Sequence, residues 1–249
     1  RVLASIIKRW AKARDINNPS KHTLSSYGYI IMLLHFLTYH RRKGNGLITS
    51  IESERTSNNP LTFGPLLPNL QRMDPAWLRT PAGQQPYSEL ERVPQQLIPH
   101  PLEDKMSVNT YFHRITNPQE LTEVQNRFPS QDLSLAILLA SFFRYYAFEF
   151  DYKRHVVSMQ STAKRGMVER EIKAETHAWK VYSTGLAIED PFETFYDVAH
   201  VLKGGNFHRL RNELGLAYTK IINAVENGST GGIDLIDLIC EPLEKAEPA

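Results

Sequence analysis

Lys8, Lys12, Ser26 and Tyr27 are spaced so that together they could bind an anion and a flat ring. Lys8 and Lys12 are four residues apart, so a helix places both ammonium groups on one face, where they suit a phosphate. Ser26 lies in a run of hydroxyl side chains that can cap a helix, and the aromatic ring of Tyr27 follows it. Each feature also has a plainer interpretation, namely a solvated lysine face and a helix cap followed by a core aromatic residue.

A second group of polar residues is Asp190-Pro191-Phe192-Glu193. Asp at the N-cap, Pro at the first helical position and Glu at the third are typical of a helix start with a capping box. The pattern therefore predicts a helix from this point to about Leu202. Starting that helix is by itself a sufficient role for the motif.

Two groups of acidic residues could be metal ligands by their residue types. Glu149 and Asp151 are two residues apart on an expected strand, so they share a face, as a two-metal site requires. No third carboxylate is evident nearby, which favours a solvated strand face. Gly228-Ser229 followed by Asp234 and Asp237 faintly resembles a Gly-Ser and paired-aspartate metal signature, but its acids are three apart, which favours a solvated acidic tail.

Several common catalytic patterns are missing from the sequence. The nine histidines and the single cysteine, Cys240, form no set with zinc-ligand spacing. The sequence contains no G-x-S-x-G, no P-loop and no G-x-G-x-x-G motif. These absences argue against a zinc site, a serine hydrolase of that type and the common phosphate-binding loops.

The elements that position these residues are mostly helical by their periodicity. Apolar residues recur at helical spacing in four segments. We expect helices over 1–14, 23 to about 40, from Ser130 to the aromatic run near 145, and 206–225. Phe148–Asp151 and His155–Met159 are expected to form a small strand pair joined by a charged turn. The predicted fold class is α+β, mostly α, a helical domain with a small β element.

The middle of the chain has a different composition. Residues 41–130 hold eleven of the fifteen prolines, which predicts a long surface excursion with short helices. The end of the chain is acidic and is expected to fray. We therefore divide the chain into a helical start at 1–40, a Pro-rich excursion at 41–130, a second helical part at 131–227 and an acidic tail at 228–249.

Composition and charge limit the class of protein. An apolar content of 41% and a charged content of 22% are those of an ordinary globular protein. The longest apolar run, Tyr27 to Tyr39, is too short to cross a bilayer, so we expect no membrane contact. Residues 1–50 carry nine Lys and Arg against the single acid Asp15, although the whole chain has a net charge of only +2. This basic end indicates a phosphate-bearing partner.

Four sequence blocks, in this order, resemble the terminal uridylyltransferase and cytoplasmic poly(A) polymerase family of template-independent RNA nucleotidyltransferases. The family's patterns are K-x-W-A-K…I-N-x-P…T-L-S-S-Y-x-Y, P-x-L-P-N-L-Q, F-F-x-Y-Y-A-x-x-F-D and I-E-D-P-F-E. The matching residues are Lys8–Lys12 with Ile16-Asn17 and Thr23–Tyr29, Pro65–Gln71, Phe142–Asp151, and Ile188–Glu193. The blocks span about 100 to 120 residues and leave 72–130 unmatched.

The resemblance implies a role for each matching residue. Lys8 and Lys12 would hold the triphosphate of UTP or ATP, and Ser26 would hydrogen-bond a phosphate. Tyr27 would stack on the incoming base, and Asp190 with Glu193 would face the edge of the base. Mg²⁺ or Mn²⁺ would be held by three carboxylates of a palm-like sheet domain, which is expected to precede Lys8 and to be absent from this chain.

The chain departs from the family pattern near the end of the last block. Tyr196 stands where uridylyltransferases have a His that favours UTP by crowding out adenine, so the resemblance leaves the choice of base open. The family's N-V-[AG]-R is Asp197–His200 here, which removes a basic group. Arg209 and Arg211 on the following helix are expected to compensate by contacting RNA or phosphate.

The function expected from the resemblance is addition of UMP or AMP to an RNA 3′ end. The chain is interpreted as the nucleotide- and RNA-binding central domain with the poly(A)-polymerase-associated segment, as a fragment that is inactive alone. The alternative is a non-catalytic RNA-binding or scaffolding member of the same family, with 41–130 as a surface for protein partners. One cysteine fits a reducing compartment, so we expect the cytoplasm, with the nucleus as the alternative.

Overall fold

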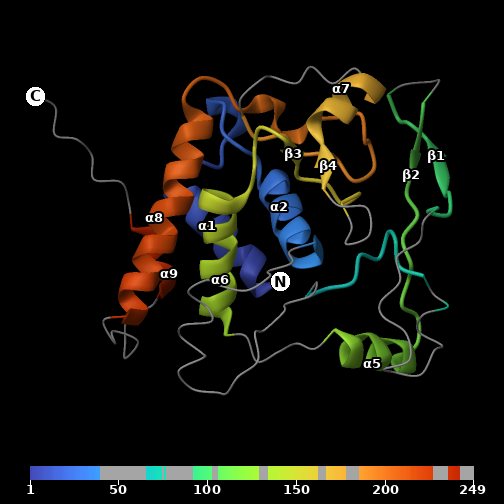
Figure 1. The fold of residues 1–249 in the computed structure, drawn as a ribbon, viewed down its shortest axis with the longest axis horizontal. Coiled ribbons are helices and arrows are strands. Elements are labelled where there is room, and N and C mark those ends of the chain that lie inside the picture. The colour runs from blue at the N-terminus through green and yellow to red at the C-terminus, as the bar shows by residue number, and fades with distance from the viewer. Residues whose placement is uncertain are drawn as a thin grey trace, which may run out of the picture.

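The computed structural model describes residues 1–39, 66–74, 76, 92–102, 106–128, 134–161, 167–177, 185–226 and 235–241. These residues are mostly helical, with two small two-stranded sheets (Figure 1). The predicted fold class is therefore confirmed. A group of helices forms one side of the molecule, and helix α5 with the ribbon of strands β1 and β2 lies on the other (Figure 1).

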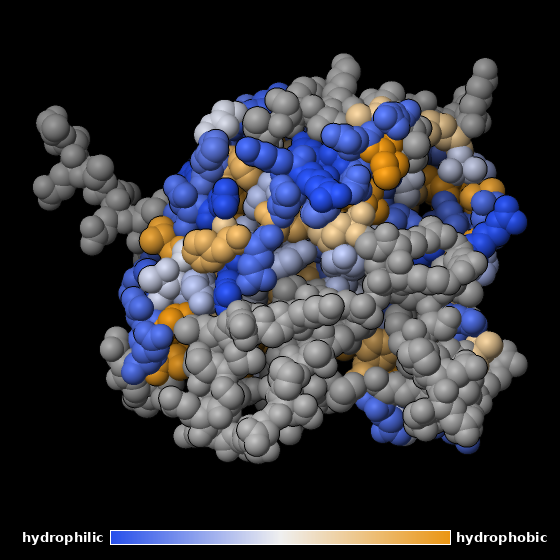
Figure 2. Space-filling model, in the orientation of Figure 1, coloured by the Kyte–Doolittle hydropathy of each residue, from blue (hydrophilic) through white to orange (hydrophobic). Residues whose placement is uncertain are grey.

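Five of the described helices form the helical side. They are α1 (Val2–Ala13), α2 (Ser26–Tyr39), α6 (Leu135–Arg144), α8 (Asn206–Glu226) and α9 (Leu235–Cys240). Helix α6 packs along α8, and α9 contacts both α1 and α8. Helices α1, α2, α6 and α8 lie where the apolar periodicity predicted them. Most of the coloured surface in Figure 2 is hydrophilic, with small apolar patches, because these helices turn their apolar faces inward.

Aromatic residues fill the centre of this group of helices. Trp10 from α1 and Phe142, Phe143 and Tyr146 from α6 and its continuation are almost completely buried. The rings of Trp10 and Phe143 meet edge to face at 4.8 Å, an arrangement that aromatic pairs prefer. The hydroxyl of Tyr146 donates to the carbonyl of Met32 at 2.8 Å, so α6 and α2 are joined by a hydrogen bond as well as by packing.

The expected strand pair near residue 150 is wrong in its first strand and in its pairing. Residues Tyr145–Glu149 continue α6 as a π-helical turn, in which Phe150 N–H donates to Tyr145 O at 2.9 Å. Strand β3 (His155–Val156) does form, but it pairs with β4 (Val168–Glu169). The helix continues through the aromatic run because it buries Tyr145 and Tyr146 in the core, which local alternation did not reveal.

The helix predicted from Asp190 to about Leu202 is also wrong. The Asp190 side chain accepts from the N–H groups of Phe192 and Glu193, as a helix cap would. The chain then turns back, because Asp190 N–H donates to Tyr196 O at 3.1 Å and Glu189 pairs with Asp197. Helical structure appears only as a short 3₁₀ turn at Val198–Val201. We call residues 189–197 the hairpin loop.

The described part of the Pro-rich excursion contains a ribbon and a helix. Strand β1 (Leu97–Pro99) runs antiparallel to β2 (Ser107–Asn109), with Leu97 opposite Asn109. Helix α5 (Pro118–Arg127) begins at the Asn117 cap, whose side chain accepts from Glu120 N–H at 2.7 Å. A further helix, α7 (Arg170–His177), follows β4, and a 3₁₀ turn (Pro19–Lys21) links α1 to α2. The short helix was expected, whereas the ribbon was not.

Residues 235–241, the described part of the expected tail, are not frayed. Helix α9 buries Ile239, and Asp237 forms an ion pair with Arg9 of α1 at 2.7 Å. Gly228, Ser229 and Asp234 of the weak metal signature lie outside the described residues. Of the helices that the structure describes, none has the length and apolar character to cross a membrane.

A buried ion pair joins three helices at the end of α1. Arg14 Nε lies 2.6 Å from Glu213 Oε2 of α8, and Arg14 Nη2 lies 3.2 Å from Glu213 Oε1. Arg14 Nη1 also donates to the carbonyl of Glu241, just after α9, at 2.5 Å. The side chains of Arg14 and Glu213 are only 10% and 7% exposed. Removal of either charge would leave the other buried without the opposite charge that pairs with it.

We expect Glu213→Leu to lower the free energy of unfolding by about 3–5 kcal/mol, because it leaves the Arg14 guanidinium buried without a carboxylate. Asp237→Leu is the matched control, since it removes the exposed carboxylate that pairs with Arg9 and should cost at most about 1 kcal/mol. Urea denaturation of both variants measures the difference. Equal losses in the two variants would contradict the importance of the buried pair.

Candidate functional site

Tyr27 and Asp190 meet although 163 residues separate them in the sequence. Tyr27 lies in the first turn of α2, and Asp190 opens the hairpin loop. The Tyr27 hydroxyl donates to Asp190 Oδ2 at 2.9 Å. Burial of the hydroxyl, followed by the hydrogen bond to Asp190, raises the pKa of Tyr27, so the hydroxyl remains protonated and can donate. Tyr27 is 44% exposed, so its side chain is accessible to a ligand.

Hydrogen bonds within the hairpin loop hold its polar side chains in place. Asp190 uses Oδ1 to accept from the loop's own N–H groups and Oδ2 to accept from Tyr27. Tyr196 N–H donates to Glu193 O at 2.7 Å, which tightens the turn. Asp190, Glu193 and Tyr196, expected from the sequence as site residues, therefore lie on one short loop beside Tyr27.

Tyr196 stands at the end of this loop and is 43% exposed. Its ring meets that of His200 edge-on at 5.1 Å. Partial burial and then the nearby carboxylates of Glu193, Asp197 and Asp190 raise the pKa of Tyr196. The side chain is therefore a bulky group whose neutral hydroxyl can donate a hydrogen bond near three carboxylates.

The ribbon of the Pro-rich excursion contributes a residue that sequence reasoning missed. His100, directly after β1, places its ring Nε2 3.0 Å from Glu193 Oε1. Leu102 N–H donates to His100 Nδ1 at 3.2 Å, so Nδ1 is an acceptor and the ring proton belongs on Nε2, the nitrogen close to Glu193. Gln71 also reaches the loop, donating to Pro191 O at 3.3 Å. No sequence signal pointed to His100, which lies in the segment without family resemblance.

Ser26 is the first residue of α2, and its hydroxyl is hydrogen-bonded to Asn17, which lies between α1 and the 3₁₀ turn. Asn17 Nδ2 donates to Ser26 Oγ at 2.9 Å, and Ser26 Oγ lies 3.3 Å from Asn17 Oδ1. The hydroxyl therefore has a defined position where free N–H groups of the helix favour an anion.

Lys8 and Lys12 lie one turn apart on α1, and both are exposed. The buried face of the same helix carries Ile7, Trp10 and Ala11, so the lysines lie outside the core. This placement leaves the two ammonium groups accessible to phosphate, although the structure does not bring them into contact with the hairpin loop.

Arg209 and Arg211 of α8 donate hydrogen bonds to main-chain carbonyls. Arg209 donates to Arg14 O at 2.9 Å, and Arg211 donates to Ala147 O at 2.9 Å. The Arg211 guanidinium also lies 5.9 Å from the centre of the Tyr152 ring. Both side chains thus join α8 to its neighbours, and their contact with RNA stays a prediction.

The described residues do not provide a site for Mg²⁺ or Mn²⁺. Across these residues, no group of three or more His, Cys, Asp or Glu side chains is arranged to hold a metal ion. Glu149 pairs with Arg144 at 2.9 Å, and Asp151 accepts from the N–H groups of Lys153 and Arg154. Glu149 and Asp151 do not share a strand face, because Glu149 belongs to the π-helical turn.

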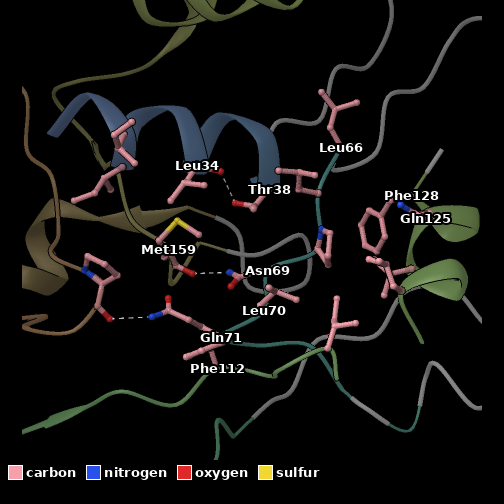
Figure 3. A pocket seen from close by; sticks show the side chains of 18 of the residues that line it. Leu34, Thr38, Leu66, Asn69, Leu70, Gln71, Phe112, Gln125, Phe128 and Met159 are labelled. Atoms are coloured by element: carbon pink, nitrogen blue, oxygen red, sulfur yellow. Dashed lines mark hydrogen bonds between the residues drawn. The ribbon is translucent and has the colours of Figure 1, made fainter. Parts of the chain in front are cut away.

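An apolar groove of about 940 Å³ begins beside Tyr27 and the hairpin loop. It runs between α2, residues 66–71 and α5, and Figure 3 shows side chains from all three segments facing it. Asn69 donates to Met159 O at 2.8 Å on its wall. Among the described residues its lining has no Lys, Arg, Asp or Glu, so the groove suits apolar or aromatic groups and not phosphates.

Residues 134–194 match the model of the Cid1 family of poly A polymerases. Terminal uridylyltransferase cid1 of Schizosaccharomyces pombe is 25% identical over 229 residues, which are 88% of this chain and 43% of that protein. Poly(A) RNA polymerase GLD2 of Mus musculus is 25% identical over 227 residues, which are 90% of this chain and 34% of that protein. The chain thus spans less than half the length of these curated relatives.

Solved structures show the same fold. A cytoplasmic RNA terminal U-transferase aligns with a TM-score of 0.58 at 24% identity, covering 98% of this chain and 58% of that one. Cid1 in complex with the UTP analogue UMPNPP aligns with a TM-score of 0.54 at 25% identity, covering 95% of this chain and 56% of that one. By these matches of sequence and fold, the chain is similar to Cid1-type terminal uridylyltransferases and GLD2-type poly(A) polymerases, and its residues 134–194 match the PAP-associated domain of the Cid1 family.

Proposed function

We propose that this chain is the nucleotide- and RNA-binding part of a template-independent nucleotidyltransferase that adds UMP or AMP to RNA 3′ ends. The observation that carries the proposal is the hydrogen bond of 2.9 Å between Tyr27 and Asp190. It places an exposed aromatic ring beside acceptors of hydrogen bonds, which is the combination that a nucleobase needs. Cid1 has been solved with a UTP analogue and with its short product ApU, which supports nucleotide and RNA as ligands here.

The base would stack on the ring of Tyr27 and turn its edge toward the hairpin loop. The N3–H group of uracil and the amino group of adenine are both donors, so the carboxylates of Asp190 and Glu193 are suitable acceptors. Stacking of a base on an aromatic side chain contributes about 1–3 kcal/mol. Tyr27 keeps a fixed ring orientation for this contact because Asp190 holds its hydroxyl.

The triphosphate would lie on the side of Tyr27 away from the groove, since the described groove lining has no basic residue. Ser26 offers a hydroxyl held by Asn17 at the start of α2, where anions are favoured. Lys8 and Lys12 would supply positive charge from the exposed face of α1. These three residues recognise any nucleoside triphosphate, so the choice of base rests with the hairpin loop.

Catalysis by the complete protein would need Mg²⁺ or Mn²⁺ held by carboxylates outside the described residues. Two facts support this: the described residues offer no metal-binding cluster, and the curated relatives are more than twice as long as the matched region. Cid1 structures with Mg and a nucleotide show the combination in a relative. By itself the chain should bind nucleotide without transferring it.

We further propose that the complete protein acts in the cytoplasm.

The direct test is extension of a short RNA by the complete protein with Mg²⁺ and each of the four nucleotides. Addition of UMP or AMP without a template is the expected result. Failure with all four nucleotides would refute the enzymatic proposal. It would leave the role of a non-catalytic RNA-binding or scaffolding member, for which the excursion at 41–130 would be the partner surface.

Tyr27→Ala should weaken nucleotide binding by about 1–3 kcal/mol, because it removes the stacking surface. Tyr27→Phe keeps the ring and loses only the hydrogen bond to Asp190, so its loss should be smaller. The KM of the complete protein for its preferred nucleotide measures both effects. An unchanged KM and rate for Tyr27→Ala would show that Tyr27 serves only the packing of α2.

Tyr196→Ala should raise kcat/KM for ATP relative to UTP by about tenfold, because it removes a bulky side chain at the base edge and makes room for the larger purine. Tyr218→Ala on α8 is the control, since this ring packs against Phe148 away from the hairpin loop. Rates with the two nucleotides are compared in the same extension assay. If both variants keep the wild-type ratio, Tyr196 does not set the choice of base.

A further inference from the structure

A pair of opposite charges is buried directly beneath the hairpin loop. Glu189 is completely buried, and the side chain of Lys173 from α7 is only 7% exposed. The Lys173 ammonium group contacts the Glu189 carboxylate. Ser158 Oγ donates to the other oxygen of Glu189 at 2.5 Å. The carboxylate is thus held from two sides by residues that lie far from it in the sequence.

Burial of such an ion pair carries a large desolvation penalty and adds little net stability. Removing two charges from water costs several kcal/mol each, and a well-packed apolar pair of the same volume is often at least as stable. Burial lowers the pKa of Lys173 to about 8, which shows that desolvation acts against its charge. The contacts of the Lys173–Glu189 pair indicate a role other than stabilising the fold.

Lys173 reaches both sides of the turn that carries the base-edge acceptors. Its ammonium group contacts the side chain of Glu189, the residue before Asp190, and donates to the carbonyl of Thr194, the residue after Glu193, at 3.0 Å. The distance between these two anchors sets the shape of the intervening turn. A single side chain thus bridges the two ends of the turn that carries Asp190 and Glu193.

The helix that carries Lys173 is itself anchored to the core. Arg170, at the start of α7, donates to Tyr152 O at 2.6 Å and to Gly185 O at 2.5 Å. Its N–H group also donates to Arg154 O at 2.9 Å. Helix α7 is therefore fixed to the turn before β3 and to the segment that leads into the hairpin loop. The backbone that carries Lys173 is therefore held in a fixed position.

We infer that Lys173 is a positioning residue for nucleotide selection, acting through Glu189 and Thr194 to hold the hairpin loop against Tyr27. The inference rests on the proposed function and deepens it. Lys173 touches neither base nor phosphate in this arrangement. Its loss should therefore affect how well the base is recognised, while the triphosphate contacts of Lys8, Lys12 and Ser26 remain.

The test uses Lys173→Met in the complete protein, with RNA extension measured for UTP and ATP. We expect KM for the preferred nucleotide to rise by about tenfold to a hundredfold and the ratio of kcat/KM between the two nucleotides to move toward one, because the loop is misplaced. The rate at saturating nucleotide should change much less. Lys153→Met is the matched control, since Lys153 is exposed in the charged turn before β3.

A double variant separates positioning from folding. Lys173→Met alone leaves the Glu189 carboxylate buried without its cation and can lower the melting temperature. Lys173→Met with Glu189→Gln removes both charges, so the melting temperature should return toward that of the wild type while KM stays raised.

An unchanged KM and nucleotide ratio in Lys173→Met would overturn the inference, as would a double variant with wild-type KM. These results would leave the proposed function intact, because the wild-type protein would still extend RNA. A wild-type protein that neither binds nor uses a nucleotide would overturn both the proposed function and the inference.

Discussion

A buried hydrogen bond between His35 and Ser158 links the two halves of the candidate site. His35 lies in α2, is completely buried, and places Nδ1 3.0 Å from the Ser158 carbonyl. A carbonyl can only accept, so the imidazole must donate from Nδ1. Ser158 in turn binds Glu189 through its hydroxyl. The helix that carries Tyr27 is thereby joined through the protein interior to the loop that carries Asp190.

The main chain completes this connection. Val157 N–H donates to Ala187 O at 3.0 Å, and Glu189 N–H donates to Val157 O at 2.9 Å, so the segment after β3 supports the start of the hairpin loop. Tyr146 holds α2 from the other side by donating to Met32 O. The pair of Tyr27 and Asp190 is thus the exposed end of a continuous series of buried contacts. Changes deep in the core can therefore alter how Tyr27 and Asp190 meet at the surface.

Local sequence patterns predicted the elements whose structure depends on one buried face. Helices α1, α2, α6 and α8 follow their apolar periodicity, and the capping role of Asp190 was also expected. The prediction failed where long-range contacts overrule local preference. The segment after Asp190 has a good helix start, yet bonds to Tyr196 and Asp197 close it into a hairpin. The run at 145–149 stays helical because the core buries Tyr145, Tyr146 and Ala147.

The sequence by itself determined the helical character of the protein, its family resemblance and the identities of the candidate nucleotide-binding residues, because these depend on residue type and short spacing. Only the tertiary structure decided that Tyr27 and Asp190 meet, that His100 of the unmatched segment faces Glu193, and that Lys173 lies beneath the loop. The reason is physical. Such contacts join segments far apart in the chain, and their geometry follows from how the whole core packs.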